Sequence, residues 1–197
     1  MATKRSVVPV ISIERARTAL AAAIKRDRDR RNKAFRRLSD GEKRVTIAGD
    51  VLDQLDAKRF VPTFGTYLEV PFSVETKFYD GNLKVDEVLS GVTCEVCGIG
   101  SLFVAAVDRA NACTVDDMQS PSDDEFMREY LGEWFSREQL EMIEAAFEGR
   151  QIWILGFSSI KDSFKKCVRF TSRVKSPEGR LRKIMRNIVE NKGVFVP

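Results

Sequence analysis

Four cysteines are the side chains of this sequence best suited to redox or metal chemistry, and Cys94 and Cys97 form a C-x-x-C motif. We expect this motif at the N-terminus of a helix, where the helix dipole favours a thiolate. Thioredoxin-type catalysis is not indicated. The residues around the two cysteines do not match the aromatic-Cys-Gly-Pro-Cys pattern of that chemistry, and the predicted helix is too apolar to admit a substrate. A zinc site that adds Cys113 and Cys167 is one interpretation. The alternative, which we predict, is free buried thiols in a reducing compartment, with no metal and no cofactor.

Few other residues offer catalytic chemistry. The sequence has no histidine, which removes Ser-His and Cys-His nucleophile pairs and histidine metal sites. Five carboxylates form an acidic cluster without the glycine and final glutamate of a calcium loop: Asp116, Asp117, Asp123, Asp124 and Glu125. We interpret the cluster as an acidic loop that leads into a helix N-terminus. Phosphate-binding and dinucleotide-binding glycine motifs are missing. We therefore predict no catalytic residues and a protein that is not an enzyme, with a cysteine- or carboxylate-dependent enzyme as second alternative.

An arginine-rich run at residues 25–37 is the strongest candidate for binding, since eight of its thirteen residues are basic. One interpretation is a solvated helix face supported by Asp27 and Asp29, and the other is a surface that contacts phosphates or an acidic protein patch. Base stacking is not indicated, because Phe35 is the only aromatic residue in the run. We predict that the basic residues contact a partner protein or nucleic acid. They are Lys25, Arg26, Arg28, Arg30, Arg31, Lys33, Arg36 and Arg37.

Charge is segregated along the whole chain of 197 residues, although the net charge is only +4. Residues 1–44 hold 14 Lys and Arg against 5 Asp and Glu, and residues 151–197 hold 11 against 3. The middle is acidic, with 5 against 10 in residues 45–110 and 3 against 11 in residues 111–150. Either the acidic middle packs beside the basic ends and neutralises them, or a basic surface meets a polyanion or an acidic protein.

The elements that must position these residues follow from hydrophobic spacing. Ser12–Leu38 predicts one long helix, in which we expect the first half to bury an apolar face and residues 25–33 to project outward. Cys94–Ala110, apolar on nearly every side and capped by Thr93, predicts a central buried helix whose glycines require close approach of another backbone. Residues 60–65 contain turn residues and predict a break. Helices are also expected over 41–58, 136–148 and 177–191, with another opening at Ser122, and strands over 66–70, 73–79 and 151–157, with a turn at 80–82.

The predicted fold class is α+β and mostly α. A central buried helix is surrounded by amphipathic helices and a small antiparallel sheet, with a long basic N-terminal helix attached. We divide the chain into an N-terminal basic helical extension, residues 1–40, and a single globular α+β domain, residues 41–197. Apolar runs are too short for a membrane span or a secretion signal, so we expect a soluble, cytoplasmic protein that does not bind membranes.

Three segments carry a resemblance to known proteins. They are Cys94–Phe103, Trp134–Glu148 and Leu181–Asn191 with the tail Gly193–Pro197. Together they resemble an uncharacterised group of small bacteriophage and mobile-element proteins, over about residues 41–197. The group offers no known activity to carry over to this chain, and the resemblance implies only a phage-encoded protein in the bacterial host cytoplasm.

The setting that the resemblance implies suggests a mode of action. Small phage proteins without catalytic groups often act by stoichiometric binding. We therefore expect an accessory protein that binds a bacterial host or defence complex, with or without RNA or DNA, as an anti-CRISPR-like inhibitor of an RNA-guided complex does. A small-molecule ligand is not expected, and the oligomeric state stays open. The alternative is a nucleic-acid-binding protein that uses residues 25–37 directly, through salt-sensitive contacts with the backbone.

Overall fold

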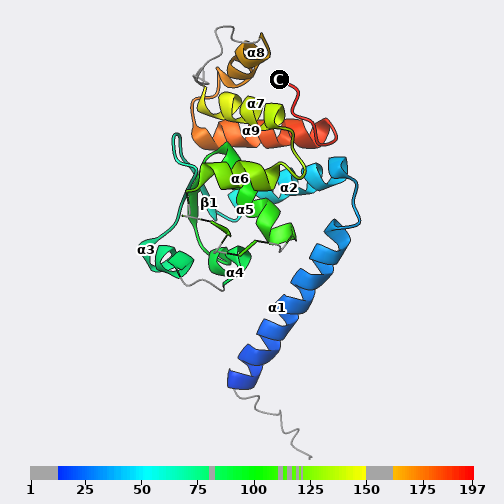
Figure 1. Ribbon diagram of the computed structural model, residues 1–197, viewed down its shortest axis with the longest axis vertical. Helices are drawn as coiled ribbons and strands as arrows, with labels where there is room; N and C mark the ends of the chain where they lie inside the picture. The colour runs from blue at the N-terminus through cyan, green and yellow to red at the C-terminus, as the bar shows by residue number, and fades with distance from the viewer. Residues whose placement is uncertain are drawn as a thin grey trace, which may run out of the picture.

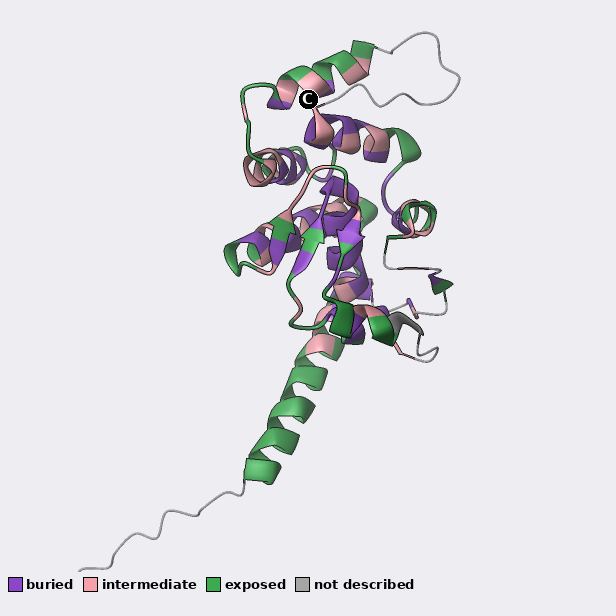
Figure 2. Cartoon of the chain, turned by 90° about the vertical axis from the view of Figure 1, so that its left-hand side faces the viewer, coloured by how far each residue is buried: buried purple, intermediate pink, exposed green. Residues whose placement is uncertain are grey.

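The computed structural model describes residues 13–79, 83–110, 113–114, 117–118, 120, 122–149 and 162–197. The predicted cap at Ser12, the turn at 80–82 and the strand over 151–157 lie outside the described residues. The fold is α+β and mostly α, as predicted. Helices pack around a small sheet, and helix α1 (Ile13–Phe35) extends away from this body as an arm (Figures 1 and 2).

The centre of the body is helix α5 (Gly98–Ala110), which is buried on nearly every side, as predicted. The helices packed against it are α2 (Asp40–Asp56), α4 (Val85–Leu89), α6 (Asp124–Leu131), α7 (Arg137–Glu148) and the C-terminal end of α1. The close approach of another backbone is confirmed at Gly100, where a Cβ would collide with the carbonyl oxygen of Tyr67, whereas Gly98 is approached by the side chains of Phe147 and Ile143.

The start of α5 differs from the prediction, because the chain from Cys94 to Val96 forms strand β3 and not the first helical turn. This strand is the centre of a mixed sheet with the order β1-β3-β2. Strand β1 (Phe60–Pro62) runs parallel to β3, and strand β2 (Leu68–Glu69) runs antiparallel to it. The expected purely antiparallel sheet is therefore wrong, and the expected break at 60–65 contains a strand.

The strand predicted over residues 73–79 is also wrong. Pro71 opens a short helix, α3 (Phe72–Glu75), and a 3-10 helix, η1 (Thr76–Tyr79), follows it. The Pro71 carbonyl accepts the N–H groups of Val74 and Glu75 at 2.7 and 3.0 Å. The proline thus begins a helical turn, which overrides the strand preference of the alternating residues that follow.

The ends of the remaining helices follow local capping. Ser136 caps α7, and Ser176 caps α9 (Pro177–Glu190), at the starts of the helices predicted over 136–148 and 177–191, while Gly149 ends α7 with a φ of 64°. Ser39 caps α2, and Asp123 caps α6 one residue after the predicted opening at Ser122. Helix α8 (Asp162–Thr171), which the sequence pattern left unassigned, packs on α7, and α9 packs on α2 and α7.

Candidate binding surface

One face of α1, near the C-terminal end of the helix, holds the arm on the body. Arg28, Arg31, Asn32 and Phe35 lie at i, i+3, i+4 and i+7, so they share a face. Asn32 and Phe35 are buried. The Phe35 ring meets the Trp134 ring edge-on, with ring centroids 5.8 Å apart. We call these four α1 residues the anchor face.

Two arginines of the anchor face bind carboxylates of the body. Arg28 Nη1 donates to Asp86 Oδ2 at 2.7 Å, and its Nη2 donates to Glu87 Oε1 at 3.2 Å. Arg31 Nη1 donates to Asp108 Oδ2 at 3.4 Å. Only 1% of the Asp86 side chain is exposed, and this burial raises its pKa while the Arg28 guanidinium opposes the rise. These two arginines therefore neutralise carboxylates of α4 and α5.

The prediction for the first half of α1 is wrong, and the prediction for residues 25–33 holds only in part. Residues 13–27 are all exposed, including the apolar side chains Ile13, Leu20 and Ile24, which were expected to be buried. The basic middle, expected to project outward, supplies Arg28 and Arg31 to the body. The physical reason is that α4 and α5 present carboxylates at this contact, so arginine is favoured there over an apolar residue.

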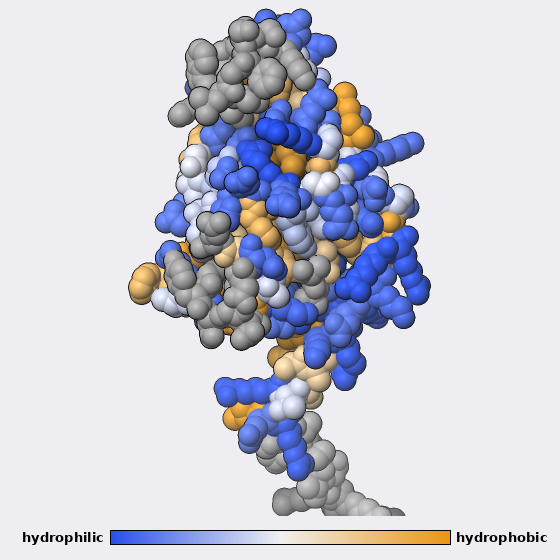
Figure 3. Space-filling view, viewed as in Figure 1, coloured by the Kyte–Doolittle hydropathy of each residue, from blue (hydrophilic) through white to orange (hydrophobic). Residues whose placement is uncertain are grey.

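A second face of α1 points its cations into solvent. Arg26, Arg30 and Lys33 lie at i, i+4 and i+7, on the side of the helix opposite Arg28 and Arg31, and Arg37 follows the helix end. Lys25 and Arg36 are exposed as well. We call these six residues the basic face. Figure 2 shows the arm exposed over most of its length, and Figure 3 shows hydrophilic and hydrophobic side chains both reaching solvent on it.

Within the described residues, few side chains of the basic face form ion pairs. Arg30 Nη2 donates to Asp27 Oδ1 at 2.6 Å, and both side chains are exposed. In the part of the chain that the structure describes, no carboxylate forms an ion pair with the other five: Lys25, Arg26, Lys33, Arg36 and Arg37. Of the eight predicted contact residues, the structure therefore places two on the body and leaves six toward solvent.

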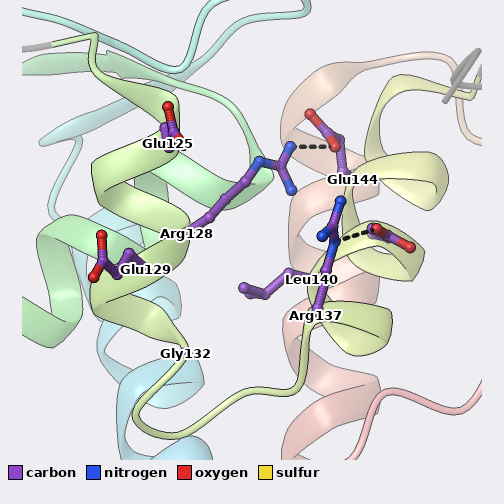
Figure 4. A pocket seen from close by; sticks show the side chains of 8 residues that line it. Glu125, Arg128, Glu129, Gly132, Arg137, Leu140 and Glu144 are labelled. Carbon is purple, nitrogen blue, oxygen red and sulfur yellow. Dashed lines mark hydrogen bonds and ion pairs between the residues drawn. The ribbon is translucent and has the colours of Figure 1, made fainter. Parts of the chain in front are cut away.

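A hollow of about 460 Å³ lies between α6 and α7 (Figure 4). Arg128 Nη2 crosses from α6 to donate to Glu144 Oε2 at 2.5 Å, and it also donates to the Tyr67 hydroxyl at 2.9 Å. The Tyr67 hydroxyl donates to Glu144 Oε1, and burial raises its pKa. Arg137 pairs with Glu141 at 3.0 Å on the same wall. These pairs join α6, α7 and the segment before β2, which is a structural role.

The four cysteines are separate and buried. The prediction that the motif lies at a helix N-terminus is wrong for Cys94, which lies in β3, and holds for Cys97, which directly precedes α5 and whose Sγ accepts the N–H of Gly100 at 3.5 Å. Burial raises the pKa of Cys94 and Cys167 to about 11 and of Cys97 and Cys113 to about 12. Within the described residues, no three cysteine or acidic side chains gather where a metal ion would bind.

The acidic cluster supplies helix and turn caps where the structure describes it. Asp117 Oδ2 accepts the backbone N–H and the hydroxyl of Thr114, both at 2.8 Å. Asp123 Oδ1 accepts the N–H of Phe126 at the start of α6. This matches the interpretation as an acidic loop before a helix, and Asp116 lies outside the described residues.

Comparison with known proteins found no matching family model, no matching curated protein and no matching solved structure. The resemblance to phage proteins therefore stays a prediction. Across the described ranges, every helix is too short or too polar to cross a membrane.

Sequence reasoning missed the anchor face and the bare apolar side of α1. The available signal was the spacing of Ile13, Leu20 and Ile24, which continues into Arg28, Arg31 and Phe35 along one side of the helix.

Proposed function

We propose that this chain is a phage accessory protein that binds a bacterial host or defence complex stoichiometrically and without catalysis. The basic face of α1 makes the contact. The observation that carries this proposal is the division of α1 between two faces. One face is fixed to the body through Arg28 and Phe35, and the other holds cations in solvent, five of which have no carboxylate partner among the described residues. Such an arm presents a defined pattern of charge to another molecule.

Two features favour an acidic protein surface over a nucleic-acid backbone as the partner. Asp27 and Asp29 are exposed among the cations, and carboxylates at these positions repel phosphates while they add specificity toward a protein. The aromatic ring of the run is also out of reach, because Phe35 is buried against Trp134 and offers no platform for a base. Direct binding of nucleic acid is therefore an outcome of the test and not our proposal.

The test compares two variants that lose the same charge. The contact variant replaces five exposed residues of the basic face by glutamine: Lys25, Arg26, Lys33, Arg36 and Arg37. The control variant replaces five exposed residues on or near α8 and α9: Lys166, Arg169, Arg173, Lys175 and Arg186. We expect wild type and control to capture a bacterial protein at a fixed ratio from nuclease-treated lysate, and the contact variant to lose it.

Two results would overturn this proposal. Equal capture by the contact variant and the wild type would exclude the basic face as the contact. Capture that disappears after nuclease treatment, together with a steep salt dependence of binding to a bare duplex, would assign the arm to nucleic acid. Both variants should match the wild type in thermal unfolding, because exposed substitutions usually change stability by about 0.5 kcal/mol or less each.

A further inference from the structure

The hollow between α6 and α7 carries unpaired negative charge. Its two arginines each pair with a glutamate of α7 (Figure 4). Glu125 and Glu129 line it from α6, and both are exposed. Within the described residues, neither of these two glutamates forms an ion pair. Buried Leu140 lines the hollow as well, so its surface combines an apolar patch with two free carboxylates.

The surface around the hollow has the same sign of charge. Residues 122–149 hold 9 Asp and Glu against 2 Lys and Arg. Glu125 and Glu129 are four positions apart on α6, so their carboxylates follow each other at one turn of the helix, or about 6 Å. A partner that presents cations once per helical turn therefore matches this wall in both charge and spacing.

The basic face of α1 in the same chain has this pattern. Arg26, Arg30 and Lys33 recur about once per turn, at intervals of four and three residues. They lie opposite the anchor face, so they stay in solvent while the arm is fixed to its own body. Each copy of the chain thus offers one convex basic helix and one acidic hollow of complementary charge.

The arm of the same copy does not supply the basic helix to its own hollow. In the described residues, the ion pairs of α1 with the body are with carboxylates of α4 and α5. From there the arm runs away from α7 (Figure 1). A basic face that reaches the hollow must therefore come from another molecule.

We propose that the basic face of one copy binds the hollow between α6 and α7 of a second copy, with Arg26 and Lys33 placed against Glu125 and Glu129. The two surfaces in this contact are different, so the contact is heterologous. Each copy that joins leaves one arm and one hollow free. Association therefore continues beyond the dimer as the concentration rises.

This inference rests on the basic face of the proposed function and concerns its regulation. Self-association covers the basic face, and an acidic target competes with the hollow for it. Because the paired charges are exposed, the contact is weak and sensitive to salt. We expect a dissociation constant of about 10–100 µM at low salt, with a loss of affinity of about tenfold or more in concentrated salt.

The first experiment is sedimentation equilibrium of the full chain from about 1 to 500 µM, in about 50 and 500 mM NaCl. We expect the wild type to associate at low salt, and a hollow variant, Glu125→Gln with Glu129→Gln, to lose association at least tenfold. The control, Asp53→Asn with Glu69→Gln, removes the same charge from exposed positions of α2 and β2 and should associate as the wild type does. A monomeric wild type throughout, or equal loss in the control, would overturn the proposal.

The second experiment tests whether the arm and the hollow are partners. The contact variant lacks a charged arm and the hollow variant lacks a charged hollow, so each alone should stay monomeric. An equimolar mixture contains one native arm and one native hollow, and we expect it to form a complex of one copy of each that grows no further. This result would also show that both variants are folded. A mixture that stays monomeric would show that the two surfaces do not bind each other.

The two proposals fail separately. The hollow variant keeps its basic face, so it should capture the bacterial target from lysate at least as well as the wild type. Capture by a wild type that never self-associates would overturn this inference alone. Self-association of the purified protein without capture of any target would overturn the proposed function alone.

Discussion

Two ion pairs of α1 have nearly equal lengths, and we predict that they contribute very differently to stability. Arg28 lies 2.7 Å from Asp86, and Arg30 lies 2.6 Å from Asp27. The side chains of the first pair are 18% and 1% exposed, whereas those of the second are 81% and 50% exposed. Loss of Arg28 leaves the buried carboxylate of Asp86 without its guanidinium, whereas loss of Arg30 leaves the exposed carboxylate of Asp27 in contact with water and still paired with Arg31 at 3.3 Å.

The expected magnitudes follow from that difference in burial. Removing one partner of a fully buried pair costs about 3–5 kcal/mol. Because Arg28 is partly exposed, we expect Arg28→Gln to lower the free energy of unfolding by about 2–4 kcal/mol. Arg30→Gln should change it by about 0.5 kcal/mol or less. Adding Asp86→Asn to Arg28→Gln should recover part of the loss, with a coupling of about 1 kcal/mol or more between the two sites.

The deficit of Arg28→Gln should also depend on pH. Burial raises the pKa of Asp86, with Glu87 and Asp108 adding to the rise and Arg28 and Lys84 opposing it. Without Arg28 the folded pKa moves further above the unfolded value. A carboxyl with a higher pKa in the folded state destabilises that state as pH rises through the interval between the unfolded and folded values. The deficit at pH 7 should therefore shrink toward pH 5.

Urea denaturation of the full chain, monitored by circular dichroism at pH 5 and pH 7, measures these effects. Hydrogen exchange of the α1 amides reports whether the arm detaches before the body unfolds. Equal small losses for Arg28→Gln and Arg30→Gln would refute the claim that burial makes the first pair an anchor. A deficit that is independent of pH would show that Asp86 is not its origin.

Three further predictions concern the body. Gly100→Ala should cost about 3 kcal/mol or more in chemical denaturation, because its Cβ would meet a backbone carbonyl, whereas Gly49→Ala has open space and should gain up to about 1 kcal/mol. Leu102→Ala and Phe103→Ala should each lose about 2–5 kcal/mol, since both side chains are fully buried, and losses below about 1 kcal/mol at both would contradict a central α5. Burial raises the pKa of Cys97 to about 12, which leaves about a thousandfold less thiolate at pH 8 than in a free thiol, so labelling should be limited by unfolding. Rapid labelling of the native protein would disprove this.

The parts of the fold that were predictable depend on local physics. Ser136 and Ser176 bind backbone N–H groups three residues ahead, so the cap and the residue that it satisfies are neighbours in the sequence. The burial of α5 is visible in the same way, because its own residues are apolar on every side. Such elements can be predicted from the residues of one segment alone. Together they predict the mostly α, α+β fold class.

The sheet was not predictable from local patterns, because its strands are short and their partners are distant. Phe60 pairs with Cys94 in the parallel ladder, far along the sequence. The segment from Cys94 to Val96 sets the exposed Glu95 between two buried residues, but three residues are too few to separate it in the sequence from the helix that follows, and its pairing with β1 and β2 defines it as a strand. At Pro71, in contrast, a local signal was present, since the proline can open a helix as well as end a strand.

The sequence predicted the basic residues of 25–37 as one contact surface. The tertiary structure was needed to tell which of them bind the body and which face solvent. Arg28 meets a carboxylate 58 positions away and Arg31 meets one 77 positions away. Their neighbours Arg26 and Arg30 are the same residue type and lie in the same helix. Only the position of α4 and α5 against one side of α1 separates the residues that bind the body from those that face solvent.

The anchor face also explains how both interpretations of the charge segregation apply to a single helix. Arg28 and Arg31 neutralise carboxylates of the acidic middle, which is the internal interpretation. Because a helix is a rigid cylinder over a few turns, fixing these residues and Phe35 fixes the rotation of α1 about its axis. The direction of the basic face then follows. The proposed contact of the basic face therefore depends on this buried ion pair, and weakening it should disturb that contact.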